Sequence, residues 1–468
     1  MPLVAPDAPL AAPSELEAQP KRRAAFFDRT DWLSFAVTTL AALTLYLVTL
    51  APDVTLGSAG IFCVGGMYAG VAHPPGYPLS TFWAWAFIQL APIGTIVWRV
   101  AFSSAVAGAL ACGVIALMVS RGGAALAKAA SGGSLLSPRL ESQLRVGCGF
   151  AAGMVFGANG AFWWRAVIQD VWTLSILLLC LVLCLLMRWA YRPDRKRYLY
   201  AAAFTYGLTL TNSQIQLALA PAIPFLAWVG NRQVARDMFL VETLLFGGGL
   251  AAAFTGNHSL SGSEWSVAHP LFKLFVAWGA VATACAVGLT IMTSRLLTEW
   301  KAIALCAALF LFGLTPYFYV PVASMTNPPI NWGYARTVQG FFHVLTRGQY
   351  ERIHPANDAA QFAKEIRAYG TVTAVEFGWP YLGLALVPFL FLRRMAPKAR
   401  GWTLGLLAAY VYLAFLMLAV LNPSMDRSSL DMSKVFFSAS YVVLALWLGY
   451  GLTLLGVRIM KPSIPPPA

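Results

Sequence analysis

Asp170 has the most distinctive setting of the carboxylates in this chain. It lies in the run WWRAVIQDVW at residues 163–172, with tryptophans on both sides of it. An acid flanked by aromatic rings at the mouth of an apolar segment is costly to desolvate, which makes it a candidate for function. It could serve as a general base that removes a proton from a reacting hydroxyl, whereas a salt bridge to Arg165 or a helix N-cap would explain it without catalysis. Asp53, which follows Ala51-Pro52, is a second candidate base, although capping of a short turn accounts for it more simply.

A run rich in proline and glycine, GVAHPPGYPL at residues 70–79, follows the first long apolar segment. A regular helix is excluded there, because proline lacks the N–H group and glycine costs backbone entropy. Irregular backbone near lipid is tolerated only where protein covers it or where it lines a wet cavity. We therefore predict that this hairpin forms one wall of a substrate site and presents His73, Pro75 and Tyr77; an ordinary tight turn is the alternative.

A second set of polar and aromatic residues suits a sugar carried on a phosphate. Aromatic ring faces stack on the C–H surfaces of pyranose rings, amides bond hydroxyls, and arginine binds phosphate through two parallel hydrogen bonds. The run NPPINWGY at 327–334 and the run RGQY at 347–350 are predicted as a second wall, and the polar tip TNSQ at 211–214 is predicted to dip into the protein. The further predicted substrate-binding residues are Arg165, Asn212, Gln214, Asn331, Trp332, Arg347, Gln349 and Tyr350. The alternative is a loop that packs across the mouth of the bundle with solvated charges.

Metal and cofactor sites are not predicted. All five histidines fall in segments expected outside the membrane, but the chain has no HxH or HxxxH spacing. Exclusion from lipid explains their distribution. The seven cysteines lie mostly in or beside apolar segments and form no CxxC pair, so they do not indicate a disulfide framework.

The composition indicates an integral membrane protein. Hydrophobic residues make up 59% of the 468 residues and charged residues only 11%, whereas a soluble domain carries about 25% charged residues. The net charge of +14 is best explained by basic cytoplasmic loops beside anionic membrane lipid, so no nucleic acid is expected as a partner.

Apolar runs near the length of about 20 residues that crosses hydrocarbon recur along the chain. The segment 79–92 is short and aromatic and ends at Pro92. If it lies in the interface, every compact basic cluster falls on one side of the membrane, as the positive-inside rule requires. The twelve predicted spans are 33–50, 98–119, 146–163, 172–188, 198–212, 215–229, 238–254, 270–293, 302–322, 373–393, 402–421 and 436–456.

This topology divides the chain into three parts. Residues 1–30 are expected to form a disordered cytoplasmic N-terminus, residues 31–458 the transmembrane domain, and residues 459–468 a short cytoplasmic tail. Both termini are therefore predicted to be cytoplasmic. The long outer loops are predicted at 51–97 and 323–372.

Several of these motifs occur together, in order, in a known family. The series resembles bacterial membrane proteins related to the plexin-type protein O-mannosyltransferase, within the GT-C superfamily of lipid-linked-sugar glycosyltransferases, and it covers about residues 33 to 456. The HPPGYPL run is fairly specific and the others support it. The motifs are LAPDVT at 50–55, HPPGYPL at 73–79, WRV at 98–100, QDVWTL at 169–174, LTLTN at 208–212, NPPINWG at 327–333 and VFF at 435–437.

The resemblance implies an all-α polytopic membrane protein, a GT-C-like bundle of about 12 transmembrane helices with interfacial helices in the first outer loop. It also implies a bacterial inner-membrane enzyme that moves a sugar from a polyprenyl-phosphate donor to a hydroxyl of a protein or glycan, with inversion. In such families the base comes from an Asp-Ser-Gly-Glu-like stretch of the first outer loop, where this chain has residues 57–61, GSAGI, and no carboxylate. Ser213 likewise replaces the histidine of a Thr-Asn-His stretch.

Three functions remain open at this point. An inverting glycosyltransferase fits the ordered motifs, with Asp170 or Asp53 as the base. A catalytically inactive homologue that binds a lipid-linked glycan or a partner protein fits the missing loop acids. A transporter is supported only by the number of spans.

Overall fold

The computed structural model describes residues 25–130, 137–255, 265–348, 350, 354–356, 358–424 and 426–460. Its described part is built from helices. In that part the β-structure consists of one isolated bridge between Val71 and Asn331. The α-helices are α1 (Arg29–Val48), α2 (Ala59–Tyr68), α3 (Pro78–Leu90), α4 (Ile96–Ala130), α5 (Pro138–Gly157), α6 (Gly160–Ala166), α7 (Trp172–Tyr191), α8 (Arg197–Asn212), α9 (Ile223–Gly230), α10 (Arg232–Thr255), α11 (Phe272–Thr293), α12 (Trp300–Gly313), α13 (Tyr319–Met325), α14 (Val338–Leu345), α15 (Ala359–Phe377), α16 (Trp379–Leu390), α17 (Pro397–Val411), α18 (Met417–Leu421) and α19 (Arg427–Met460). Short 3-10 segments are η1 (Gln214–Ala222), η2 (Thr315–Phe318), η3 (Trp332–Tyr334) and η4 (Leu392–Arg394), and η5 (Tyr412–Leu416) is a π-helical turn.

The structure confirms an all-α polytopic membrane protein. Among the described residues, eight helices are long and apolar enough to cross a membrane, or up to ten if each of two bent pairs counts as one span. The predicted count of twelve is not confirmed. The prediction at 198–212 corresponds to α8, which has only 16 residues, and the one at 215–229 to η1 followed by α9, a short run interrupted by Pro221.

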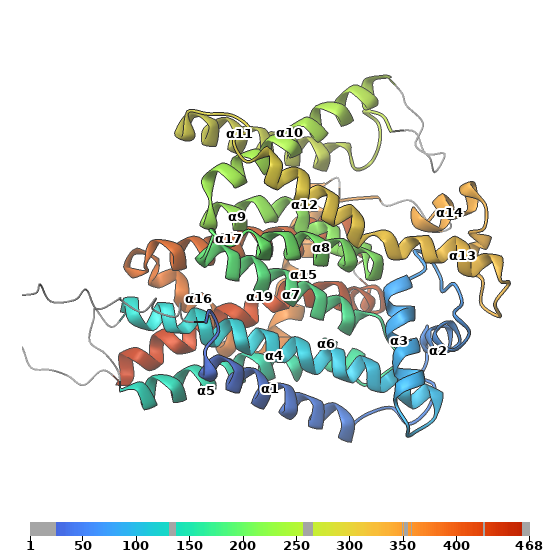
Figure 1. The fold of residues 1–468 in the computed structure, drawn as a ribbon, viewed down its shortest axis with the longest axis horizontal. Helices are drawn as coiled ribbons and strands as arrows, with labels where there is room; N and C mark the ends of the chain where they lie inside the picture. Colours follow the sequence, from blue (N-terminus) through green and yellow to red (C-terminus); the bar gives the residue numbers. More distant parts are fainter. Residues whose placement is uncertain are drawn as a thin grey trace, which may run out of the picture.

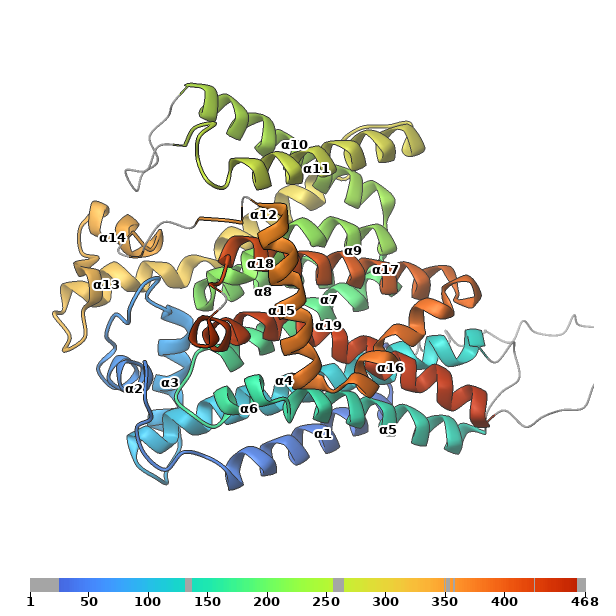
Figure 2. The same ribbon diagram turned by 180° about the vertical axis from the view of Figure 1, so that it is seen from behind.

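Two predicted spans contain a sharp break. α5 and α6 meet at 78°, and α15 and α16 meet at 106°. At the first break Asn159 has extended backbone and its side chain caps the new helix α6. At the second break Gly378 has a φ of 80°, which ends α15, and α16 begins at Trp379 with Pro380 in its first turn. The view in Figure 2 shows α15 running across the direction of the long helices.

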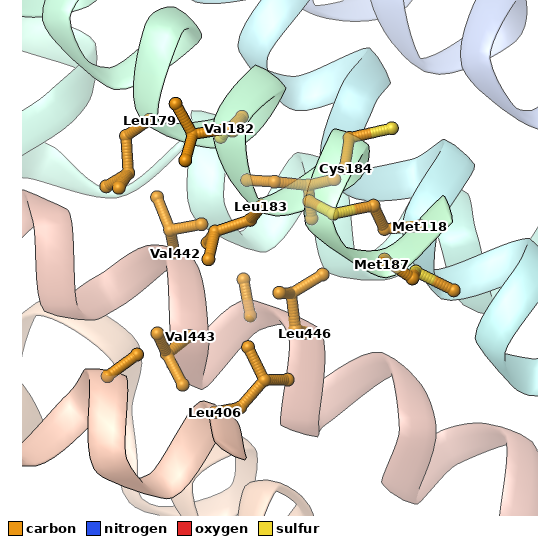
Figure 3. Close-up of a cluster of buried hydrophobic side chains, with 14 of the residues drawn as sticks. Met118, Leu179, Val182, Leu183, Cys184, Met187, Leu406, Val442, Val443 and Leu446 are labelled. Atoms are coloured by element: carbon orange, nitrogen blue, oxygen red, sulfur yellow. The ribbon is translucent and has the colours of Figure 1, made fainter. Parts of the chain in front are cut away.

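The hydrophobic core lies where α4, α7, α17 and α19 meet. In α4 and α7, 83% of the most apolar stretch is buried, against 11% in α10. Figure 3 shows Met118 of α4, Leu183 of α7 and Val442 of α19 packed together, with Leu406 of α17 beside them. The α10–α11 hairpin lies at the margin of the bundle in both overall views (Figures 1 and 2).

The connections around α2, α3, α13 and α14 gather at one end of the long helices. Helix α1 begins at the other end (Figures 1 and 2). α3 has 13 residues and is too short to cross a bilayer. The structure thus has two short helices, α2 and α3, within 51–97, and their position in the membrane interface stays a prediction. The segment 323–372, expected as a loop, contains α14 and the larger part of α15.

A buried ion cluster fixes α1 against α5 at the opposite end. The Arg145 guanidinium lies 2.6 Å from Asp31 and 2.8 Å from Asp28, and the Arg145 side chain is 7% exposed. Ser120 of α4 donates a hydrogen bond of 2.6 Å to the same Asp31 carboxylate. One arginine and its carboxylate partners thus connect three helices at this end of the bundle.

Candidate active site at one end of the bundle

The two predicted walls are joined by backbone hydrogen bonds. The Val71 N–H donates to the Ile330 carbonyl at 2.9 Å, and the Trp332 N–H donates to the Val71 carbonyl at 3.1 Å. A Cβ atom on Gly70 would lie 2.7 Å from the Ile330 carbonyl oxygen, so glycine allows this approach. Segments some 260 residues apart in the chain therefore form one structural unit.

The hairpin turns sharply and buries an aromatic cluster around His73. Gly76 has a φ of 93° and Tyr77 a φ of 43°, and the Pro74–Pro75 peptide bond is cis. The His73 ring centroid lies 5.0 Å from that of Tyr77, 5.5 Å from that of Phe62 and 6.4 Å from that of Trp332. Within the described residues the His73 Nδ1 atom is buried without a hydrogen-bond partner.

Asp170 forms the salt bridge that the sequence offered as an alternative to catalysis, and it also accepts a hydrogen bond at the start of α7, where Val171 is the N-cap residue. Its Oδ2 atom lies 2.7 Å from Nη1 of Arg165, and its Oδ1 atom accepts a hydrogen bond of 2.8 Å from the Trp172 N–H at the start of α7. The Asp170 side chain is 5% exposed and that of Arg165 is 31% exposed. Burial raises the pKa of Asp170 above its ordinary value, and the charge of Arg165 opposes that rise.

Ser104 of α4 fixes the backbone of the same residue. The Ser104 hydroxyl donates to the Asp170 carbonyl at 3.1 Å, and the Asp170 N–H donates to the Ser104 hydroxyl oxygen at 3.2 Å. Sequence reasoning missed Ser104. The polar pair Ser103-Ser104 inside a long apolar run was the available signal.

Asp170 and the proline-rich hairpin share one small pocket. Tyr77 and Ala72 of the hairpin pack against Val171, the neighbour of Asp170. The pocket has room for about one water molecule. Its lining residues are Phe62, Gly65, Ala72, Ser80, Thr81, Ala84, Val100, Ser103 and Asp170.

Arg347 brings a positive charge to the hairpin from the second wall. Burial lowers the pKa of His73 and the charge of Arg347 lowers it further, so the imidazole is neutral at pH 7. Burial raises the pKa of Tyr77 to about 12, while Arg347 opposes that rise and Asp170 adds to it. The Arg347 guanidinium also lies over the Tyr350 ring, 4.8 Å from its centroid.

Asn212, predicted to bind substrate, is fully buried beside Asp170. Its Nδ2 atom donates to the Val171 carbonyl at 2.9 Å and to the Ser175 hydroxyl at 2.7 Å. In this structure the amide fixes the turn that carries Asp170. The polar tip of α8 does enter the protein, as predicted.

The side-chain amides of Gln214 and Asn331 also donate hydrogen bonds to backbone carbonyls. Gln214 donates to the Leu345 carbonyl at 2.7 Å, and Asn331 donates to the Ser324 carbonyl at 3.0 Å. Both residues therefore tie the second wall to neighbouring elements.

Of the predicted site residues that the structure describes, Asp170 alone belongs to the pocket lining. Asp53 is exposed, and its Oδ1 atom accepts a hydrogen bond of 2.7 Å from the Val54 N–H, as expected for a turn cap. Pro75 is buried inside the hairpin. Gln349 lies outside the described residues.

Metal ligands do not cluster in the described part of the chain. No group of three His, Cys, Asp or Glu side chains there is placed to hold an ion. The charges that the pocket region offers to a substrate come from Asp170, Arg165 and Arg347.

These features define a polytopic all-α membrane protein in which a buried carboxylate, paired with a partly exposed guanidinium, lies beside a proline-rich wall. Residues 59–236 match the family model described as the Protein O-mannosyl-transferase TMEM260 N-terminal domain. The predicted resemblance to O-mannosyltransferase-related membrane proteins is thereby confirmed. The matched segment contains the hairpin, Arg165 and Asp170, but neither Asp53 nor the second wall.

Curated relatives carry the same description. The mouse Protein O-mannosyl-transferase TMEM260 is 28% identical over 212 residues, which cover 44% of this chain and 27% of that protein. The corresponding Dictyostelium discoideum protein is 24% identical over 254 residues, covering 50% of this chain and 28% of that protein. The matches thus span about a quarter of the length of these relatives.

One solved structure that the comparison matches is that of ArnT from Cupriavidus metallidurans bound to undecaprenyl phosphate. It is 14% identical, and the comparison covers 92% of this chain and 77% of that chain with a TM-score of 0.29. This likeness is too distant to position individual residues.

Proposed function

We propose that this chain is a membrane glycosyltransferase that moves a sugar from a polyprenyl-phosphate donor to a hydroxyl of a protein or glycan acceptor. The observation that carries the proposal is the meeting of Asp170 with the proline-rich hairpin in one pocket. The match of residues 59–236 to an O-mannosyl-transferase model supports the reaction class. The proposed location is the bacterial inner membrane, with the pocket at the outer face and both termini in the cytoplasm.

Asp170 would act as the general base. Its carboxylate takes the proton of the acceptor hydroxyl, whose oxygen attacks the anomeric carbon from the face opposite the phosphate. The bond from that carbon to the phosphate oxygen breaks, the electron pair leaves with polyprenyl phosphate, and the configuration inverts. General-base help of this kind contributes about 10²–10⁴ in rate.

The surroundings of Asp170 suit this role. Burial raises its pKa and so makes the carboxylate a stronger base, while Arg165 at 2.7 Å favours the ionised form that a base requires. Among the described residues, Asp170 is the one carboxylate in the pocket lining. The stretch 57–61, where a first-loop acid is expected from the resemblance, instead leads into α2, and Asp53 is exposed.

Arg347 and the aromatic cluster would hold the donor. The guanidinium matches the charge and the geometry of a phosphate. The neutral His73 beside it has a buried, unpartnered Nδ1 atom within the described site, which could bond a sugar hydroxyl. Trp332 is 41% exposed, which leaves part of its ring face free to stack on a sugar. The pocket itself accommodates about one water, so the sugar would lie at its mouth with only the reacting hydroxyl near Asp170.

A matched pair of substitutions tests the proposal. Asp170→Asn should lower sugar transfer by about 10²-fold or more, with polyprenyl-phosphate mannose as the first donor and solubilised envelope protein as the acceptor in proteoliposomes. Asp53→Asn removes an exposed acid of the same region and should leave the rate within about twofold. Full turnover by Asp170→Asn would remove Asp170 from the mechanism.

The missing first-loop acid favours one second candidate, a homologue that binds a lipid-linked glycan without turning it over. Wild-type protein that binds the labelled donor but releases no polyprenyl phosphate when acceptor is added would support that function. Acceptor-dependent release eliminates it.

A further inference from the structure

We infer that Glu376 is a positioning residue for the Arg165–Asp170 pair, acting from a part of the chain outside the segment that matches the family model. It lies at the end of α15, beside the sharp bend into α16. The expected effect of Glu376 on turnover rests on the proposed function. The contact by which Glu376 holds α6 can be tested without any measurement of activity.

Two hydrogen bonds connect Glu376 to the start of α6. The Ala161 N–H donates to Oε2 of Glu376 at 3.0 Å, and Nδ2 of Asn159 donates to the Glu376 carbonyl at 3.1 Å. The Asn159 Oδ1 atom accepts from Ala161 at 3.1 Å and from Phe162 at 3.4 Å. The first turn of α6 is thus held by its own cap and by a carboxylate from more than 200 residues away.

The contact leaves little space between the two segments. A Cβ atom on Gly160 would lie 3.1 Å from the Glu376 carboxylate, which is tight for a real side chain. The Glu376 side chain is 10% exposed. A negative charge beside the first N–H groups of a helix is favourable, because those groups carry partial positive charge.

Lys434 of α19 adds a third segment to this junction. Its Nζ atom lies 3.8 Å from Oε1 of Glu376 and 2.7 Å from Oδ1 of Asp431. The Lys434 side chain is 29% exposed. Lys434 thus brings a positive charge near Glu376 that it shares with Asp431, and α6, α15 and α19 converge on one polar junction.

α6 transmits this contact to the proposed active site. The helix has seven residues, so it spans about 10 Å, and its last turn carries Arg165, whose Nη1 atom lies 2.7 Å from Asp170. A helix this short is not stable by itself and takes its position from tertiary contacts. Phe162 packs on Phe156 with ring centroids 4.4 Å apart, so loss of Glu376 should shift or loosen α6 rather than unfold the bundle.

The experiment compares Glu376→Ala, Glu376→Gln and Glu365→Gln. Glu365 is a matched control because it is a buried acid of the same helix whose carboxylate accepts a hydrogen bond from Gln361, a residue of its own helix. Glu376→Ala should lower kcat by about 10- to 100-fold, because it removes a hydrogen bond to a charged group. The KM for polyprenyl-phosphate mannose should stay within about threefold of the wild-type value. Glu376→Gln keeps an oxygen acceptor for the Ala161 N–H and should recover most of kcat, and Glu365→Gln should behave as wild type.

Amide hydrogen exchange supplies the readout that does not depend on catalysis. In Glu376→Ala the amides of α6 should exchange about tenfold faster, while those of α7 stay unchanged. The α6 amides of the Glu365→Gln control should exchange as in wild type. Unchanged α6 exchange in Glu376→Ala overturns the inference whatever the activity. Faster α6 exchange in a protein whose wild type shows no transfer supports the positioning role and refutes the proposed function instead. Faster α6 exchange with wild-type kcat, or equal kcat losses in the Ala and Gln variants, overturns the link from Glu376 to the catalytic pair.

Discussion

Replacing Arg165 by methionine tests how much its charge favours the ionised form of Asp170. The substitution preserves an unbranched side chain but removes the guanidinium that lies 2.7 Å from the Asp170 carboxylate. Removing one partner of a fully buried ion pair costs about 3–5 kcal/mol. Because the Arg165 side chain is 31% exposed, water replaces part of the lost interaction, and we expect about 1–3 kcal/mol. The Trp172 N–H remains as a donor to the carboxylate.

The sign of the effect follows from the role of Asp170 as a base. Burial already holds the pKa of Asp170 above 3.8, and loss of the positive charge raises it further. The ionised base exists above that pKa, so the acid limb of the pH–rate profile should move to higher pH. On that limb a cost of about 1–3 kcal/mol lowers the rate roughly 5- to 150-fold, and the loss should diminish as the pH rises. Since the folded-state pKa exceeds 3.8, the contribution of Asp170 to stability is present below that value and is lost as the pH rises through the folded-state pKa.

The assay is the initial rate of sugar transfer in proteoliposomes between about pH 5 and pH 9. Arg336→Met is the matched control, because Arg336 is exposed and lies over the Tyr334 ring, 5.3 Å from its centroid. A loss of the same size at every pH would refute this reasoning and assign Arg165 to donor binding. The double variant with Asp170→Asn should be no slower than Asp170→Asn alone, since the two residues act as one unit.

Two further predictions concern the stability and the orientation of the bundle. Arg145→Met should lower the free energy of unfolding in detergent by about 3–5 kcal/mol, because it leaves the fully buried Asp31 without its cation. Adding Asp31→Asn to this variant should recover part of the loss. A change in the free energy of unfolding below about 1 kcal/mol would contradict the proposed ion pair. A cysteine at Leu56, which is 95% exposed near the pocket end, should react with an impermeant maleimide from outside intact cells, whereas the native cysteines are buried or half-buried; reaction only from the cytoplasmic side would invert the proposed topology.

The sequence alone was enough to predict the fold class and the local parts of the site. Long apolar runs with few charges specify membrane helices, because hydrocarbon offers no partner to a backbone polar group. The contacts of Asp170 with Arg165 and with the Trp172 N–H could also be predicted from the sequence, because all three residues lie in one stretch of eight, 165–172. The irregular hairpin followed directly from the chemistry of proline and glycine.

Tertiary structure alone decided how these parts come together. Hydropathy measures the length of an apolar run, but it does not show where a helix bends, and the breaks at Asn159 and Gly378 depend on caps and turns. The roles of the predicted amides changed for a related reason. Asn212 and Asn331 could meet either a ligand or a carbonyl, and only packing shows which partner is near.

The long-range contacts had no local signal at all. Val71 pairs with the segment around Ile330, and Glu376 reaches the start of α6, across more than 200 residues in each case. Such pairs become neighbours only when the helices between them pack. The chain sequence therefore specifies which groups are available for chemistry, whereas the packing of the bundle specifies which of them meet.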